Sequence, residues 1–146
     1  MNYSLRQASI KDLDAIYELQ SDYNHLILSK NSLKDELESD LSYYLIAEAK
    51  DKVIGSIGIN ILVDHADITM VITKKDSTNL GIGTALLNNV IAKCKQLKLE
   101  NIFLEVRNSN TAAIHLYEKV GFANISTRKN YYSDTHEDSL IYVKKI

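Results

Sequence analysis

The sequence predicts a mixed α/β fold in a single domain spanning residues 1–146. Strand-like and helix-like segments alternate in the order strand, two helices, three strands, helix, strand, helix, two strands. Near the middle, a glycine-containing loop and a long amphipathic segment join two β-branched runs, which is the pattern of two parallel strands linked by a helix. Hydrophobic residues make up 45% of the chain and charged residues 25%, as in ordinary globular domains.

The central unit begins with a β-branched run, Asp67–Thr73, which reads as a buried strand. A polar loop ending in Gly81 and Gly83 follows. The next segment has apolar residues at helical spacing: Leu86, Leu87, Val90, Ile91, Cys94 and Leu97. Glycines at the start of a helix allow a tight turn and close approach of a ligand, and the first helical N–H groups form an anion site. The sequence therefore indicates a ligand that carries phosphate.

The glycine loop also has other possible interpretations. A Walker A loop is excluded because no Lys-Ser or Lys-Thr follows the glycines. A dinucleotide fingerprint would find an acidic residue in Glu105, but the third glycine position is Leu86 and the loop comes late in the chain. Dinucleotide binding and a plain strand-to-helix turn remain alternatives at this point.

The first half of the chain predicts an edge strand, two helices and a hairpin. Tyr3–Gln7 alternates apolar and polar residues. Ser9 and Asp12 form a capping box for a helix with apolar residues at Ile10, Leu13, Ile16, Tyr17 and Leu19, and Ser32 with Asp35 predicts a second helix ending near Ser39. Tyr43–Ala49 and Val53–Leu62 are two β-rich runs around a short charged turn, as in an antiparallel hairpin.

The second half predicts the remaining strand, helix and closing pair of strands. Asn101–Val106 is a strand, and the cap residues before Thr111 start a helix that ends at Gly121. Phe122–Lys129 and Ser139–Lys145 read as strands.

Charge and composition limit the classes of function. A net charge of -2 and a pI near 6.1 give no general attraction to nucleic acid or anionic membranes. The N-terminus lacks a signal-peptide core and no apolar run is long enough to span a membrane, so we expect a cytoplasmic protein. The single cysteine, Cys94, reads as a core residue. The four histidines lack zinc-ligand spacing, so no metal is expected.

Two motifs carry a family resemblance. The segment LEVRNSNTAAIHLYEKVGF, residues 104–122, together with the Gly81-Ile82-Gly83 loop, resembles the Gcn5-related N-acetyltransferase (GNAT) superfamily. With RKNYY at 128–132 and the acidic pair 137–138, residues 104–142 are similar to bacterial ribosomal-protein-alanine N-acetyltransferases. The first half matches only in element order.

The resemblance implies the GNAT fold, a twisted mixed sheet whose two central parallel strands splay apart around acetyl-CoA. Those strands would be Asp67–Thr73 and Asn101–Val106. The implied cofactor-binding residues are Val71, Ile72, Thr73, Asn79, Leu80, Gly81, Ile82, Gly83, Thr84 and Asn110. The loop departs from the superfamily pattern because Thr78, Asn79 and Leu80 replace its usual Gln or Arg and basic residues, although Lys74, Lys75 or Lys119 could offset that loss.

Two residues are expected to carry the chemistry. Glu105, at the carboxyl end of a parallel strand, is assigned as the base that deprotonates the amine through a water, with an ion pair to Arg107 or a lysine as the alternative. Tyr117, two helical turns after Asn110, is assigned as the acid for the thiolate, with a core tyrosine as the alternative. The N–H of Ile72 is expected to polarise the acetyl carbonyl.

The implied activity is acetyl transfer to the α-amine of a protein N-terminus, such as that of a ribosomal protein. Tyr131 and Tyr132 would line a peptide slot, with the acidic residues after them favouring a cationic N-terminus, or they belong to an ordinary hairpin. Alternatives are a GNAT enzyme for a small amine, such as a polyamine, amino acid or aminoglycoside, and a non-catalytic acyl-CoA-binding module.

Overall fold

The computed structural model describes residues 2–78 and 80–146. The strands are β1 (Ser4–Gln7), β2 (Ser42–Ala49), β3 (Lys52–Ile61), β4 (His65–Thr73), β5 (Asn101–Arg107), β6 (Ala123–Arg128) and β7 (Ser139–Lys145). The α-helices are α1 (Leu13–Leu19), α2 (Lys30–Glu38), α3 (Ile82–Gln96) and α4 (Thr111–Lys119), and short 3-10 turns are η1 (Ile10–Asp12), η2 (Gln20–Asp22) and η3 (Lys75–Ser77). The predicted element order is confirmed.

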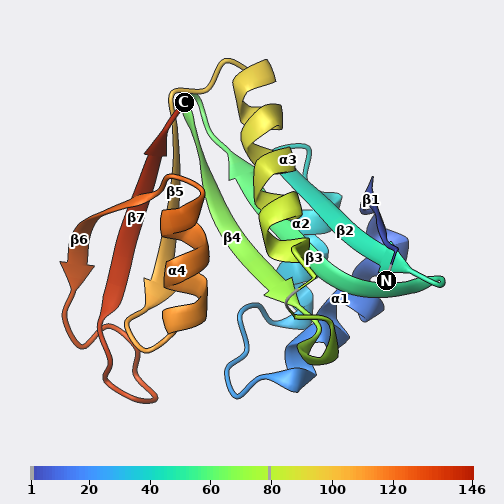
Figure 1. Ribbon diagram of the computed structural model, residues 1–146, viewed down its shortest axis with the longest axis horizontal. Coiled ribbons are helices and arrows are strands. Elements are labelled where there is room, and N and C mark those ends of the chain that lie inside the picture. Colours follow the sequence, from blue (N-terminus) through green and yellow to red (C-terminus); the bar gives the residue numbers. More distant parts are fainter. Residues whose placement is uncertain (1, 79) are drawn as a thin grey trace.

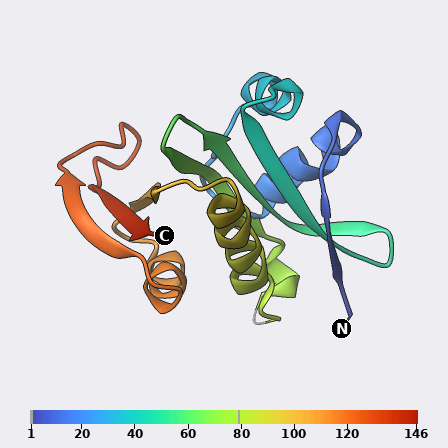
Figure 2. The same cartoon turned by 90° about the horizontal axis from the view of Figure 1, so that it is seen from above.

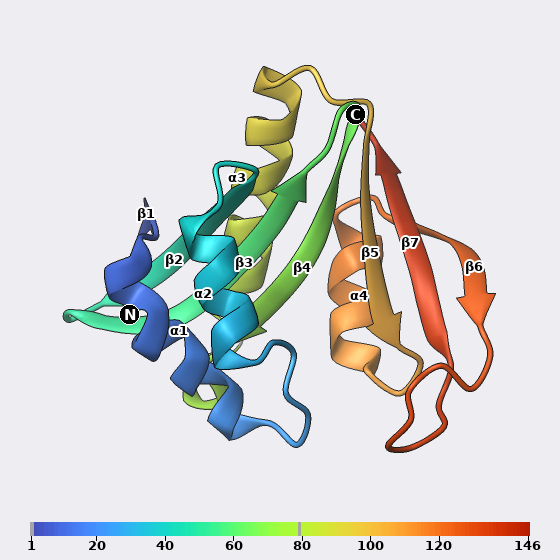
Figure 3. The same cartoon turned by 180° about the vertical axis from the view of Figure 1, so that it is seen from behind.

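The strands form one mixed sheet in the order β1-β2-β3-β4-β5-β7-β6. Neighbouring strands are antiparallel except β4 and β5, which are parallel as predicted. Helices α3 and α4 cover one face (Figure 1), and α1 and α2 cover the other (Figure 3). The view along the sheet shows the three layers (Figure 2).

Helices and turns begin where local chemistry favours them, with one correction. The capping box of Ser9 and Asp12 is present at η1, which leads into α1. Helix α2, however, is capped by Ser29, whose hydroxyl accepts from the N–H of Ser32, so the predicted cap at Ser32 was wrong by one turn. Both serines have the right chemistry, and the fold uses the earlier one. In the β2–β3 turn, Lys50 and Asp51 have φ of 51° and 62°, consistent with a tight hairpin.

Two hydrophobic clusters hold the layers together. The larger packs the predicted stripe of α3 against the sheet, and Cys94 is fully buried within it. Burial raises the pKa of Cys94 to about 11, as expected of an inert core thiol. The stripe ends one turn earlier than predicted, because Leu97 is 41% exposed. The smaller cluster packs α1 and α2 on the opposite face and includes Ile16, Leu33, Met70 and Ile72.

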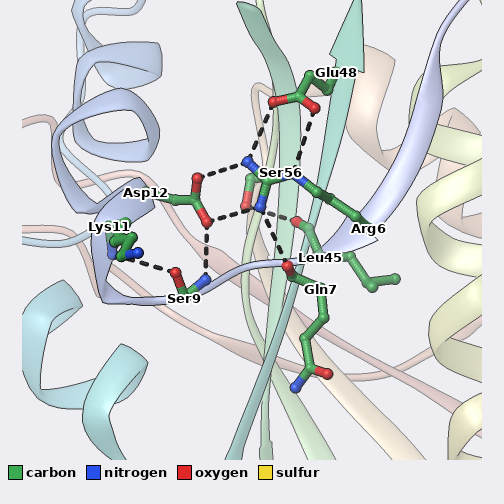
Figure 4. A network of polar contacts seen from close by, with 8 residues as sticks. All are labelled: Arg6, Gln7, Ser9, Lys11, Asp12, Leu45, Glu48 and Ser56. Atoms are coloured by element: carbon green, nitrogen blue, oxygen red, sulfur yellow. Dashed lines mark hydrogen bonds and ion pairs between the residues drawn. The ribbon is translucent and has the colours of Figure 1, made fainter. Parts of the chain in front are cut away.

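A polar network fastens β1 to its neighbours (Figure 4). The Arg6 guanidinium donates to both carboxylate oxygens of Asp12, at 3.1 and 2.9 Å, and also to Glu48 on β2. Asp12 in turn accepts from the N–H of Ser9 at 2.8 Å. One carboxylate therefore serves both the cap and the edge strand.

The central strands splay apart as predicted. Strands β4 and β5 pair only from His65↔Asn101 to Asp67↔Phe103 and then diverge (Figure 1), whereas β5 pairs with β7 over its whole length. Just beyond the last β4–β5 pair, Thr69 has no partner on β3, because Ile68 pairs with Ile59 and Met70 with Gly58. This β-bulge bends β4 where its pairing to β5 ends.

Candidate functional site

A cleft of about 1720 Å³ lies where the central strands separate. It is lined by β4, β5, the N-termini of α3 and α4, and two loops, residues 23–27 and 131–132. The predicted site residues that line it are Val71, Ile72, Thr73, Gly81, Ile82, Gly83, Thr84, Glu105, Asn110 and Tyr117. Leu80 is exposed and does not line it, and Asn79 lies outside the described residues.

The backbone of β4 presents alternate amides to this cleft. The N–H of Lys74 donates to the carbonyl of Ile54 at 2.8 Å, so Lys74 faces β3. The backbone N–H groups of successive residues in a strand point to opposite edges of that strand. The N–H of Ile72 therefore also points toward β3, while those of Val71 and Thr73 point into the gap. The Ile72 amide, expected to polarise the carbonyl, is directed away from the cleft, and the Val71 amide is the better candidate. The carbonyl of Thr73 already accepts from the Tyr23 hydroxyl.

The two glycines before and within α3 have different roles. Gly81 is the N-cap, with φ 76° and ψ 12°, a left-handed conformation that favours glycine. A Cβ on Gly83 would lie 2.8 Å from a methyl group of Leu116, so this glycine allows α3 and α4 to pack closely. The N–H groups of the first helical turn after Gly81 have no acceptor within the helix, and the residues of that turn, Ile82, Gly83 and Thr84, line the cleft. No acidic residue lies in that turn, and Lys75 and Lys119 line the cleft, whereas Lys74 does not.

Glu105 is held by two partners from the C-terminal strands. Ser139 donates to one carboxylate oxygen at 2.9 Å, and Arg128 lies 3.5 Å from the other. The side chain is 35% exposed, so water and a ligand can reach it. The alternative of an ion pair is correct in kind but not in its partner: Glu105 pairs with Arg128, whereas Arg107 binds Asp134 and Glu137.

Helix α4 brings two predicted residues to the cleft, Asn110 at its N-cap and Tyr117 within it. Asn110 caps α4 by accepting from the N–H of Ala113 at 3.2 Å, which leaves its amide N–H groups available to a ligand. Tyr117 is 7% exposed, packs beside Phe122 and belongs to the larger core, yet it also lines the cleft. Burial raises the pKa of Tyr117, and among the described residues its hydroxyl has no hydrogen-bond partner.

Loops of both halves form the outer wall of the cleft. Arg107 stacks 3.8 Å from the ring centre of Tyr132 and binds Asp134 and Glu137 at 3.0 Å each. His25, from the loop before α2, lies 2.9 Å from Asp134 and so joins the two loops. The hydrogen bond from Arg107 lowers the pKa of Asp134 to about 2.

The acidic residues after Tyr132 therefore already have cationic or polar partners within the protein. Asp138 accepts from the N–H of Asn130 and pairs with Lys129. These contacts weaken the expectation that this segment attracts a cationic N-terminus. They indicate instead that the acidic residues shape the loop around Arg107 and Tyr132.

Sequence reasoning missed several residues of the site. Ser139 and Arg128 contact Glu105 from strands 34 and 23 positions away, and Tyr23 and His25 come from the opposite half of the chain. No local pattern signals such contacts, since they arise from the order of strands in the sheet.

The described residues show neither a metal-ligand cluster nor a membrane-spanning helix. Within residues 2–78 and 80–146, no three His, Cys, Asp or Glu side chains are grouped as metal ligands would be. None of the helices in that part of the chain has the length and hydropathy needed to cross a bilayer.

The chain is similar to known proteins in family, sequence and structure. Residues 11–122 match the model of the acetyltransferase (GNAT) family. A Bacillus subtilis (strain 168) protein, provisionally named ribosomal protein bS18-alanine N-acetyltransferase, is 34% identical over 94% of this chain and 92% of its own length. An N-alpha-acetyltransferase of Sulfurisphaera tokodaii is 30% identical over 95% of this chain and 91% of its own.

Solved structures agree. The crystal structure of the ribosomal-protein-S18-alanine N-acetyltransferase from Escherichia coli superposes with a TM-score of 0.92 at 26% identity, covering 99% of this chain and 94% of that one. The family match, the two sequence relatives and the shared fold together show that this chain belongs to the acetyltransferase (GNAT) family.

Proposed function

We propose that this enzyme transfers an acetyl group from acetyl-CoA to the α-amine of a protein N-terminus, such as that of a ribosomal protein. The observation that carries the proposal is the cleft through the split sheet, which has the α3 and α4 termini on one side and Glu105 with the loops of residues 23–27 and 131–132 on the other. A donor and an acceptor can therefore enter from opposite faces. The names of the relatives, which are N-terminal and ribosomal-protein acetyltransferases, support this acceptor class.

The donor side offers groups suited to a coenzyme A thioester. The Val71 and Thr73 amides face the gap and can pair with the amides of the pantetheine arm as an added strand would. The N–H groups of Ile82, Gly83 and Thr84 can bind pyrophosphate at the start of α3. Lys75 and Lys119, which line the cleft, are placed to add positive charge near the pyrophosphate, whereas Lys74 is not. The amide N–H groups of Asn110 can reach the arm near the thioester.

Glu105 is the proposed base. A free α-amine has a pKa of about 7.7 to 8.0, so most of it is protonated at neutral pH and must lose that proton before it attacks. The carboxylate, partly exposed and oriented by Ser139 and Arg128, can accept the proton through a water. The new N–C bond then forms as the C–S bond breaks.

Tyr117 is the proposed acid. Its raised pKa keeps the hydroxyl protonated, so the proton is available for the departing thiolate. A thiol pKa of about 8.5 against an unperturbed tyrosine near 10 already makes this transfer uphill by about 2 kcal/mol. This cost is small enough for the proton to move to the sulfur as the C–S bond breaks.

An acceptor panel tests the proposal. Release of coenzyme A thiol is measured with peptides that begin with free Ala or Ser, the same peptides with a blocked N-terminus and an internal lysine, and a set of polyamines, amino acids and aminoglycosides. We expect turnover only with the free N-terminus, and mass spectrometry should place the acetyl group on the α-nitrogen. Faster turnover of a small amine would contradict the acceptor proposal and leave the donor assignment intact.

A further inference from the structure

The β-bulge in β4 determines which amides face the cleft. The carbonyl of His65 accepts from the N–H of Leu62, so at this end of β4 the backbone groups of the odd-numbered residues point toward β3. After the unpaired Thr69, the backbone groups of the even-numbered residues point toward β3, as the hydrogen bond from the N–H of Lys74 to the carbonyl of Ile54 shows. Without the extra residue, the amides of Val71 and Thr73 would bond to β3, and those of Met70 and Ile72 would face the gap in their place. The position of Thr69 therefore fixes the donor-binding face of the strand.

Thr69 is held in place from behind by a compact polar triad. Its hydroxyl donates to Oε1 of Glu36 on α2 at 2.9 Å, and the Tyr44 hydroxyl on β2 donates to the same oxygen at 2.6 Å. The two hydroxyls lie 3.2 Å apart. Hydrogen bonds to a carboxylate are shorter and stronger than bonds between neutral groups. One glutamate thus ties the bulge to a helix and to a second strand.

The ring of Tyr44 completes the support. It lies directly over Gly58, the β3 residue opposite Met70, and any Cβ at position 58 would overlap the ring. Tyr44 is 3% exposed, and burial, with the bond to Glu36, raises its pKa, so the hydroxyl stays a donor. The Thr69 hydroxyl also lies 3.3 Å from the Gly58 carbonyl. The triad therefore holds both strands at the bulge.

We propose that Glu36 and Tyr44 are positioning residues for acetyl transfer, which act by holding Thr69 in the β4 bulge and so direct the Val71 and Thr73 amides toward the donor. Neither side chain lines the cleft, so neither contacts the substrates. The inference rests on the donor half of the proposed function and not on the identity of the acceptor.

Variants of the two supporting residues give the first test. Tyr44→Phe keeps the ring over Gly58 and removes only the hydroxyl, and Glu36→Ala removes the shared acceptor. For both we expect kcat/KM for acetyl-CoA to fall by about 10- to 100-fold, as small displacements of a binding group do, with weaker coenzyme A binding by calorimetry. The matched control is Glu38→Ala, on the same helix but exposed and paired only with Lys34. It should leave both values unchanged.

Thr69 itself gives the second test. Thr69→Ser keeps the hydroxyl and should retain activity, whereas Thr69→Val, of nearly equal size, should match the loss in Tyr44→Phe. All rates are measured well below each variant's Tm, so that reduced stability alone does not lower them. Wild-type coenzyme A affinity and kcat/KM in folded Tyr44→Phe and Glu36→Ala, or equal behaviour of the Ser and Val variants, would overturn the proposal. Because calorimetry of coenzyme A binding needs no acceptor, a wrong acceptor class would not affect the measured coenzyme A affinities.

Discussion

At the scale of single residues, the orientation of Glu105 depends on strands that lie far from it in the sequence. Ser139 lies directly on the neighbouring strand β7, and Arg128 ends β6, the next strand out. Their two contacts fix both carboxylate oxygens at the edge of the cleft. A base that must accept a proton from a positioned amine gains from such orientation.

Replacing Glu105 tests the base assignment. Glu105→Gln keeps the shape and the bond from Ser139 but cannot take a proton, so kcat should fall by about 100-fold or more. Coenzyme A binding, measured by calorimetry, should stay near the wild-type value because the residue lies on the acceptor face. Ser139→Ala frees the carboxylate without removing it, so its kcat should lie between those of the wild type and Glu105→Gln. Undiminished turnover in Glu105→Gln would remove the assignment.

Replacing Tyr117 tests whether it acts as the acid or only as a core residue. The ring packs in the core, while the hydroxyl makes no hydrogen bond to the described residues. Tyr117→Phe should therefore leave the Tm almost unchanged and lower kcat by about 100-fold if the hydroxyl supplies the proton. Thermal melts and steady-state rates on the same sample decide. A wild-type rate would return Tyr117 to a purely structural role.

At the same scale, sequence reasoning found the residues that local pattern can mark. Glu105, Asn110 and Tyr117 all line the cleft, because strand ends and helix caps have recognisable positions. It chose the wrong amide at Ile72, since the direction of an amide depends on a bulge that no residue type signals. Gly83 lines the cleft, and it also allows close packing against Leu116, which the sequence did not indicate.

At the scale of secondary-structure elements, Asp12 connects the first helical turn with strand β1. It caps through Ser9, accepts two bonds from Arg6, and its side chain is 10% exposed. The hydrogen bonds from Arg6 are the main cause that lowers the pKa of Asp12. A lowered pKa in the folded state means that the ionised carboxylate stabilises the fold.

Acid titration of stability tests this element. The contribution of Asp12 is present above the unfolded pKa of about 3.9 and is lost as the pH falls through the lower folded value. Asp12→Asn should reduce the free energy of unfolding by about 1 to 3 kcal/mol at pH 7, and this difference should shrink as the pH falls below about 4. Urea denaturation followed by circular dichroism measures it.

A second aspartate provides the control for that titration. Asp14 is 81% exposed and pairs with the exposed Lys30, so Asp14→Asn should change the free energy of unfolding little at any pH. A constant difference between wild type and Asp12→Asn from pH 7 to pH 3 would show that Asp12 acts through shape and not through its charge.

Elements were the most predictable level of the structure. The strands of the hairpin, the α3 stripe and the Asn110 and Gly121 ends of α4 follow from periodicity and capping chemistry. The start of α2 did not, because Ser29 and Ser32 are equally good caps and tertiary packing makes the choice. The order β5-β7-β6 also has no local signature.

At the scale of the whole molecule, the two halves of the sheet meet through few backbone pairs. Three residue pairs join β4 to β5, and the larger core, with α3 packed on α4 at Gly83, also joins the two halves. A donor seated in the gap would contact both halves. Binding should therefore stabilise the whole fold and should protect the open part of β4 most of all.

Amide hydrogen exchange can test both the alternation along β4 and the site of binding. In the free protein, the Val71 and Thr73 amides should exchange fast, while that of Ile72, bonded to β3, should exchange slowly. Coenzyme A at 100 times its Kd stabilises the folded state by about 2.7 kcal/mol, or about 100-fold in globally protected amides. Amides of the β2–β3 ladder serve as the reference for that global effect.

Within β4, the local effect should exceed the global one at two positions. Val71 and Thr73 should gain more protection than the reference amides, because they acquire new acceptors in the pantetheine arm, whereas Ile72 should gain only the global increment. Fast exchange at Ile72 in the free protein would invert the alternation derived from the bulge. Equal gains at all three positions would show that the donor stabilises the fold without pairing to β4, and would move its binding to the helix termini alone.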